Sequence, residues 1–237
     1  MKLITNKQHK FVRLSKIIGE DNLSLLSSKT VLVLGCGGVG GYVVEALARS
    51  NIGSLIIVDY DTVEESNINR QIIALSSTIG KKKVDVLEDR ILDINKNCKV
   101  IKIDQLISKE NIDLLFQTPI DYFVDACDMM TTKKLVILEC LKRKIPFISS
   151  MGTGNRFDPS MLEIVDIRKT NNDPLARILR KFVKDERIKE KVMVLSSKEL
   201  PVKTHDKTPG SSAFVPSSAG LMIASTIIQY FLNETKK

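Results

Sequence analysis

Short apolar runs and amphipathic segments alternate along most of the chain. The runs 30–34 and 55–58 lack polar alternation, which is typical of parallel strands that are covered on both faces. Between these runs, Val43, Val44 and Leu47 recur at helical spacing. This first unit is therefore predicted to fold as strand, turn, helix and strand.

The same alternation continues through the first two thirds of the chain. The apolar spacing predicts two further helices, at 84–94 and 131–144, and three further strands, at 100–103, 122–124 and 147–148. Strands that alternate with helices are typical of a parallel sheet with helices on both faces. We therefore predict that residues 29–150 form an α/β, doubly wound, mainly parallel Rossmann-like sheet.

Both flanks of this core have a different pattern. Residues 1–28 are polar with an amphipathic stripe that includes Leu14 and Ile17, which predicts an N-terminal helical arm packed on the sheet or on a partner subunit. Residues 151–237 contain one basic helix between two predicted strands, without a regular crossover rhythm. We interpret this C-terminal half as the substrate-facing elaboration of a single domain spanning 1–237.

The apolar residues suffice for a core but not, by this pattern, for a membrane span. The hydrophobic content of 43% allows one substantial core in 237 residues. The longest apolar run without a charge, 221–232, is interrupted by Ser225, Thr226 and Gln229 and is too short to cross ~30 Å of hydrocarbon. No apolar stretch of signal-peptide length precedes Lys10. We therefore expect a cytoplasmic protein that does not span a membrane.

The cysteines do not have the spacing of a zinc site. Cys36, Cys98, Cys127 and Cys140 form no C-x-x-C pair. Structural zinc ions are usually held by such pairs. We therefore expect no structural zinc.

Positive charge is unevenly distributed along the chain. There are 36 basic and 28 acidic side chains, a net charge of +8. Nine basic and four acidic residues fall within 168–191. A basic helix can contact RNA phosphates without reading the sequence of the RNA. The alternative is an ordinary basic enzyme whose charged side chains are only solvated.

A glycine-rich turn follows the first predicted strand. Gly35, Gly37, Gly38 and Gly40 satisfy G-x-G-x-x-G, which lets the backbone approach a phosphate and directs a helix N-terminus at its charge. Asp59 ends the second strand, 19 residues after the last glycine, where a carboxylate can accept hydrogen bonds from ribose. The pattern indicates a nucleotide site, either for NAD or FAD in an oxidoreductase or for another nucleotide.

A polar loop, 59–71, occupies the place where a dinucleotide enzyme would begin its next helix. Its candidate nucleotide-binding residues are Asp59, Asp61, Asn67, Asn69, Arg70 and Gln71. An adenylating site must stabilise charge that builds on an α-phosphate while pyrophosphate departs, and cations serve this need. Arg70 supplies one such cation, so the loop favours ATP.

Two later residues fit the same chemistry. Lys83, at the start of the next predicted helix, can supply a second cation, and Asp128, after the strand at 122–124, is suited to Mg²⁺. Each residue has a simpler interpretation. Lys83 belongs to the lysine run 81–83, which is typical of a solvated face, and Asp128 can cap a helix.

These residues together resemble the superfamily of ubiquitin-activating, ThiF and MoeB enzymes. The shared pattern is G-x-G-G-x-G, then D-x-D-x-V, S-N-x-N-R-Q, a following lysine and a later aspartate. The resemblance implies that the glycine turn and Asp59 hold ATP and that Asp128 assists Mg²⁺. It also implies that Asn67, Arg70, Gln71 and Lys83 contact the phosphates or ribose.

The N-terminal arm carries a further point of resemblance. Lys10-Phe11-Val12-Arg13 is similar to an arm whose arginine reaches the ATP of the neighbouring subunit. This resemblance implies a homodimer with Arg13 in the active site. The alternative is a solvated arginine on an amphipathic helix.

The second half resembles one branch of the superfamily, the tRNA threonylcarbamoyladenosine dehydratases. The resemblance is carried by 151–155, Asp158-Pro159, Lys169-Thr170, 173–176 and 209–220. It implies that ATP activates the threonyl carboxylate of a modified adenosine in tRNA, which then cyclises with loss of water. The segment 211–220 lacks the cysteine that certain relatives carry there, so a thioester step is not expected.

Other functions use a similar site. The main alternative is an adenylyltransferase that acts on a ubiquitin-like sulfur-carrier protein. In that case, the carrier or a cysteine desulfurase would be a protein partner. Such relatives commonly carry paired zinc cysteines, which this sequence lacks. The third class is the nicotinamide-dependent oxidoreductase.

Overall fold

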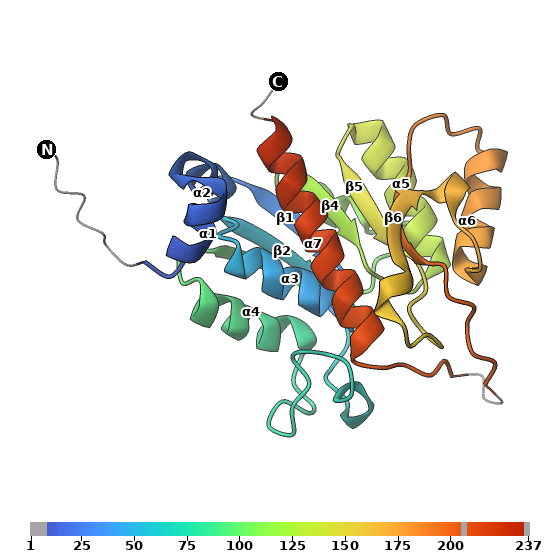
Figure 1. Cartoon of the computed structure of the whole chain (residues 1–237), viewed down its shortest axis with the longest axis horizontal. Helices are drawn as coiled ribbons and strands as arrows, with labels where there is room; N and C mark the ends of the chain where they lie inside the picture. Colours follow the sequence, from blue (N-terminus) through green and yellow to red (C-terminus); the bar gives the residue numbers. More distant parts are fainter. Residues whose placement is uncertain (1–8, 205–207, 235–237) are drawn as a thin grey trace, which may run out of the picture.

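Seven strands form one sheet in the order β3-β2-β1-β4-β5-β7-β6 in the computed structural model, which describes residues 9–204 and 208–234 (Figure 1). All neighbouring strands are parallel except β6, which is antiparallel to β7. The strands are β1 (Thr30–Leu34), β2 (Ser54–Val58), β3 (Lys99–Ile103), β4 (Tyr122–Asp125), β5 (Phe147–Ser150), β6 (Leu162–Asp166) and β7 (Met193–Ser197). The predicted α/β, mainly parallel, doubly wound sheet is confirmed.

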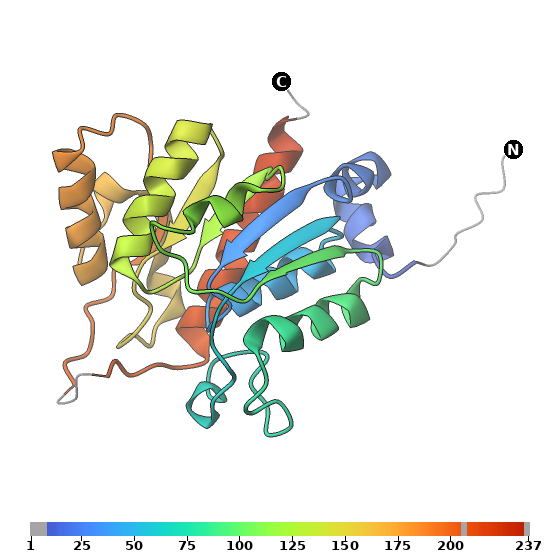
Figure 2. The ribbon, with the colours of Figure 1, turned by 180° about the vertical axis from the view of Figure 1, so that it is seen from behind.

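Helices cover both faces of the sheet. One face carries α3 (Gly40–Arg49), α4 (Lys83–Ile94) and α7 (Phe214–Glu234), as Figure 1 shows, and the other carries α5 (Met130–Arg143) and α6 (Pro174–Asp185), as Figure 2 shows. Strands β1, β2, β4 and β5 are buried almost throughout, because both of their faces pack against helices. The core therefore lies as two apolar layers, one on each face.

The C-terminal half is less separate than its sequence pattern suggested. Strand β7 pairs with β5, so β6 and β7 extend the same sheet. The missing crossover rhythm has a physical cause, because the antiparallel β6 does not need the return helix that a parallel strand needs. Helix α6 is then the basic helix predicted between the two strands.

The arm forms two short helices, α1 (Val12–Ile18) and α2 (Glu20–Leu26), separated by Gly19 with a φ of 86°. Residues 1–8 lie outside the described residues. One helix of the described chain, α7, is long and apolar enough to cross a membrane by length and composition alone. It is longer than the apolar run 221–232, so the length argument made for that run does not apply to the whole helix. However, α7 packs against α3 and buries Ile223 and Ile227 in the core.

The strand order reverses next to β1, which lies between β2 and β4. From β1 the chain first moves outward to β2 and β3, and then returns to place β4 on the other side. Loops therefore separate at the carboxyl ends of β1 and β4 and leave a crevice, which is where ligands bind in open α/β sheets.

Candidate active site

A cavity of about 340 Å³ occupies this crevice. Its walls come from the carboxyl ends of β1 to β5 together with the start of α4 and α7. The predicted site residues that line it are Gly35, Gly37, Gly38, Asp59, Asp61, Asn67, Arg70, Gln71, Lys83 and Asp128. Three predicted residues, Gly40, Asn69 and Arg13, do not line the cavity.

The glycine turn requires glycine at its two ends. Gly35 has a φ of 89°, and a Cβ there would lie 2.7 Å from the carbonyl oxygen of Ala126. A Cβ on Gly40 would lie 1.7 Å from the carbonyl oxygen of Gly35. Gly40 therefore supports the turn from behind, where α3 begins, while the other glycines leave the backbone open to the cavity.

Asp59 connects the glycine turn to the polar loop. One carboxylate oxygen accepts a hydrogen bond of 2.7 Å from the Cys36 N–H, and the other accepts one of 2.9 Å from the Asp61 N–H. Each carboxylate oxygen has more than one lone pair, so both can still accept a hydrogen bond from a ligand hydroxyl. The carboxylate is thereby fixed in the cavity wall.

Lys83 differs from its neighbours in the lysine run. Its side chain is only 7% exposed, and its Nζ lies 2.8 Å from a carboxylate oxygen of Asp61. The Lys82 side chain is 43% exposed and pairs with Asp104 at the surface. The solvated-face interpretation therefore fits Lys82 but not Lys83, whose charge is directed into the cavity wall.

Arg70 is half-buried and held by its own loop. Its Nη1 donates to the carbonyl oxygen of Ser66 at 2.8 Å and to Oδ1 of Asn69 at 2.9 Å. Asn69 in turn donates from Nδ2 to the carbonyl oxygen of Ser211 at 2.9 Å. Asn69 thus positions the Arg70 guanidinium and connects the polar loop to the segment before α7.

Gln71 and Asn67 are buried beside this arginine. Asn67 closes a capping box with Glu64 around the short helix Glu65–Asn67. The buried Oε1 of Gln71 has no hydrogen-bond partner among the described residues. An unpaired buried polar atom is costly unless a ligand or water satisfies it, and this one lies in the cavity wall.

Asp128 lies in the loop after β4, and its exposed carboxylate lines the cavity. Within the part of the chain that the structure describes, no cluster of three or more metal-ligating side chains occurs. Mg²⁺ does not need such a cluster, because one or two carboxylates, substrate phosphates and water commonly complete its shell. A single cavity-facing carboxylate beside a phosphate turn therefore fits Mg²⁺.

A buried ion pair beneath this loop was missed in the sequence. Lys133 Nζ lies 3.0 Å from Asp125 Oδ2, which also accepts a 2.6 Å hydrogen bond from Ser149 Oγ, and all three residues are buried. The other oxygen, Oδ1, accepts from the Cys127 N–H at 3.2 Å and so anchors the loop that carries Asp128. A lysine on the apolar face of a predicted helix was the available signal.

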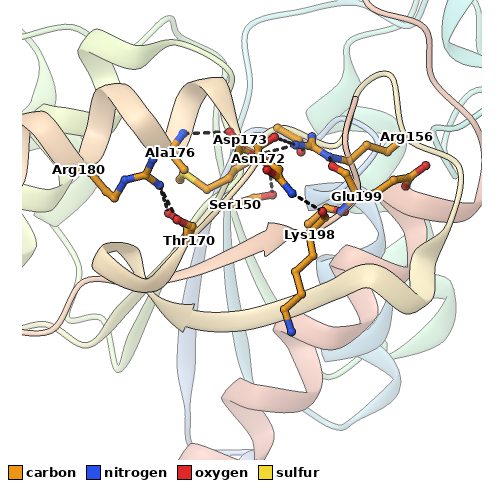
Figure 3. Close-up of polar contacts among 12 residues, drawn as sticks. Ser150, Arg156, Thr170, Asn172, Asp173, Ala176, Arg180, Lys198 and Glu199 are labelled. Atoms are coloured by element: carbon orange, nitrogen blue, oxygen red, sulfur yellow. Dashed lines mark hydrogen bonds and ion pairs between the residues drawn. The ribbon is translucent and has the colours of Figure 1, made fainter. Parts of the chain in front are cut away.

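A second buried pair organises the C-terminal half (Figure 3). Arg156 Nη2 lies 3.2 Å from Asp173 Oδ2, with both side chains at most 2% exposed. Arg156 also donates to the carbonyl oxygens of Gly152 and Asn172, while Asp173 caps α6 through the Ala176 N–H. These contacts fix the loop after β5, whose Thr153 lines the cavity.

Arg13 is exposed on α1, away from the cavity of its own chain. Helix α1 lies against the C-terminal part of α3, next to Ala46 and Ser50, whereas the glycine turn precedes the opposite end of this helix. Within one chain, Arg13 and the cavity are therefore not brought together.

The four cysteines are free and unsuited to act as nucleophiles. Burial raises the pKa of Cys98 to about 11, and burial followed by the nearby Asp59 carboxylate raises the pKa of Cys36. Burial, reinforced by Asp125, likewise raises the pKa of Cys127, which lines the cavity. These thiols stay protonated at neutral pH, and nucleophilic attack requires the thiolate.

The fold, the glycine turn and the cation-lined cavity together define an adenylating enzyme of the ThiF class. Residues 10–237 match the model of the ThiF family, and the chain belongs to this family. The resemblance seen in the sequence motifs is thus confirmed, and the nicotinamide-dependent alternative is not favoured.

More specific similarity is found with tRNA-modifying relatives. The chain is 40% identical over 243 residues to the tRNA threonylcarbamoyladenosine dehydratase of Bacillus subtilis, covering 95% of this chain and 96% of that protein. It superposes with a TM-score of 0.91 and 30% identity on the Escherichia coli dehydratase TcdA solved in complex with ATP, covering 99% of both chains.

A sulfur-carrier enzyme matches over less of its length. The adenylyltransferase and sulfurtransferase UBA4 of Vanderwaltozyma polyspora is 34% identical over 143 residues, which cover 60% of this chain and 32% of that protein. The similarity to the Bacillus subtilis dehydratase therefore covers more of both chains than the similarity to this adenylyltransferase does.

Proposed function

We propose that this protein is an ATP-dependent tRNA threonylcarbamoyladenosine dehydratase. The observation that carries the proposal is the cavity in which the glycine turn faces Lys83 and Arg70. A dinucleotide site needs to hold a pyrophosphate, whereas two cations in the cavity wall suit charge that develops as pyrophosphate leaves. Similarity to the dehydratases along nearly the whole chain supports the substrate.

The proposed reaction has two steps. A carboxylate oxygen of the threonyl group attacks the α-phosphorus of ATP, and pyrophosphate leaves with its electron pair. The carbamoyl group of the same nucleoside then attacks the acyl-adenylate and releases AMP. Because nucleophile and electrophile belong to one molecule, proximity favours ring closure. The protonated thiols support a route without a covalent enzyme intermediate.

The site residues are assigned roles in this reaction. Asp59 and the buried Gln71 Oε1 accept hydrogen bonds from ribose, the glycine turn binds phosphates, and Arg70 and Lys83 oppose the developing charge. Asp61 orients Lys83, and Asn69 orients Arg70. Asp128 would hold Mg²⁺, which neutralises phosphate charge when it is bound.

The C-terminal half is proposed to receive tRNA within a single domain. Helix α6 presents Arg177, Lys181 and Lys184 on its exposed side, while Leu179 and Val183 are buried beneath it. The apolar face of α6 packs inward, and its exposed basic face leaves these side chains available for RNA phosphates. We also propose a cytoplasmic location, in keeping with a tRNA-modifying role.

We also propose a homodimer. An apolar groove between α1, α3 and α7 is lined by Leu14, Ile17, Leu221 and Ile228, and Ile17 is 83% exposed. A second copy of this surface would cover these side chains. It would also give the exposed Arg13 a site to reach in the other subunit, as the similarity of the arm implies.

The test is incubation of the protein with ATP, Mg²⁺ and tRNA that carries threonylcarbamoyladenosine. We expect a nucleoside lighter by one water, together with AMP, when the tRNA is digested and analysed by mass spectrometry. An unchanged nucleoside mass would contradict the proposed function. Pyrophosphate exchange that responds to a carrier protein ending in Gly-Gly but not to tRNA would favour the adenylyltransferase instead.

A further inference from the structure

Two exposed phenylalanine rings form a pair beside the cavity. Phe157, in the loop after β5, is 66% exposed, and Phe214, the first residue of α7, is 53% exposed. Their ring centroids are 5.4 Å apart and their planes meet at 85°. An edge-to-face pair at the surface leaves ring faces open to solvent, where a planar ligand can cover them.

The pair lies at a defined end of the site. The cavity extends from the β3 and β2 ends, with Ile107 and Asp59, to the β5 end, with Thr153. Phe157 follows Thr153 in the same loop, and Phe214 lies between Ser211 and Pro216, which also line the cavity. With the ribose of ATP at Asp59 and its phosphates at the glycine turn, as the proposed function requires, the second substrate enters from this end.

The two rings are held by a braced framework. The carboxylate of Glu199 accepts hydrogen bonds from the Phe157 N–H at 3.0 Å and from the Asp158 N–H at 3.0 Å. Asn155 exchanges two hydrogen bonds with Gly210, of 2.7 Å and 2.6 Å, and thereby ties the loop of Phe157 to the segment that leads to Phe214. The adjacent Arg156 is fixed by its buried ion pair (Figure 3).

We propose that the Phe157–Phe214 pair is a stacking platform for an unpaired RNA base next to the modified adenosine. This inference rests on the proposed function and adds to it a base-binding site. Every base has a π face, so an aromatic platform binds an unpaired base without reading its identity. In a duplex, both faces of a base are covered by its neighbours, so the platform selects single-stranded RNA.

The test measures binding of the full-length protein to a fluorescent anticodon stem-loop by anisotropy, in parallel with a fully paired RNA duplex. Phe157→Leu keeps an apolar side chain but removes the planar ring, and Phe157→Tyr keeps the ring. We expect Phe157→Leu to weaken stem-loop binding about tenfold. Phe157→Tyr should bind as the wild type does, and Leu92→Ala, an exposed apolar change on α4, serves as the control.

Several results would overturn the platform. These are unchanged stem-loop binding by Phe157→Leu, equal weakening for stem-loop and duplex, or failure of Phe157→Tyr to restore binding. The affinity for ATP and the unfolding temperature should not move in any of these variants. Failure of the proposed function is recognised separately, because the wild-type protein would then bind RNA yet leave the nucleoside mass unchanged.

Discussion

At the scale of single residues, the position of the Arg70 side chain is set by its own loop. Arg70 makes its hydrogen bonds within its own loop, to Ser66 and Asn69. None of these contacts reaches the apolar core. The guanidinium is therefore placed by the loop but contributes little to holding the fold together.

Arg70→Ala is therefore expected to slow adenylation strongly while leaving the fold intact. Loss of one group that stabilises transition-state charge costs on the order of 10²-fold in kcat. ATP–pyrophosphate exchange measures this rate, and circular dichroism melting measures the fold. Arg143→Ala, which removes a surface arginine paired with Asp113 and Glu139, is the matched control. An exchange rate for Arg70→Ala like that of Arg143→Ala would contradict the assigned role.

The sequence predicted which residues belong to the site better than it predicted which side chains they contact. The glycines, Asp59 and Arg70 were recognised because their chemistry is tied to local spacing. Lys83 was ambiguous, because only the pairing with Asp61 distinguishes it from Lys82. The partners of Lys133 lie on the two strands that flank its helix, and the sequence does not show that these side chains meet.

At the scale of elements, a charged contact joins the helix of the glycine turn to its neighbour. Glu45 of α3 accepts hydrogen bonds from Arg90 of α4 at 2.6 Å and from Arg49 at 2.7 Å. Burial alone would raise the pKa of Glu45, but the hydrogen bonds and charges of Arg90 and Arg49 outweigh it and lower the pKa below its ordinary value. The ionised form is thus the one that stabilises the contact between α3 and α4.

Glu45→Gln is expected to lower the free energy of unfolding by about 1–3 kcal/mol at pH 7. A lowered folded-state pKa contributes stability above the unfolded-state pKa, about 4.3, and loses it as pH falls through the folded value. The difference between Glu45→Gln and the wild type should therefore shrink below pH ~4. Urea unfolding of both proteins at pH 7 and below pH ~4 measures this difference.

The control for this experiment is Asp113→Asn, which breaks a surface pair with Arg143 and should cost no more than about 1 kcal/mol. A pH-independent loss in Glu45→Gln would mean that shape, not charge, joins the two helices.

Elements were predicted well where periodicity was strong. The strands at β1 to β5 and the helices α4 and α5 follow their apolar spacing closely. The sheet position of β6 and β7 was not predicted, because the antiparallel edge strand β6 interrupts the regular alternation of parallel strands and helices. Helix α7 was not predicted as a helix, and only its apolar part, 221–232, was recognised in the sequence.

At the scale of the whole molecule, the groove between α1, α3 and α7 makes the proposed homodimer testable. Ile17→Asp places a charge on its most exposed apolar side chain, which should dissociate the dimer because burying an unpaired charge is unfavourable. Sedimentation velocity should show a dimer for the wild type and a monomer for this variant.

Leu92→Asp makes the same change on an exposed face of α4, outside the groove, and should remain dimeric. A wild type that sediments as a monomer would refute the homodimer. A monomeric Ile17→Asp that retains full adenylation would instead separate Arg13 from catalysis.

Ser211 and Pro216 form one wall of the cavity, and both follow the last strand of the sheet in the sequence. To complete that wall, α7 must approach so closely that a Cβ on Gly220 would lie 2.5 Å from the Val39 carbonyl oxygen. A chain that ended after β7 would contain every strand of the sheet and still lack this wall of the nucleotide cavity. The enclosure of the nucleotide therefore depends on the docking of α7 against α3.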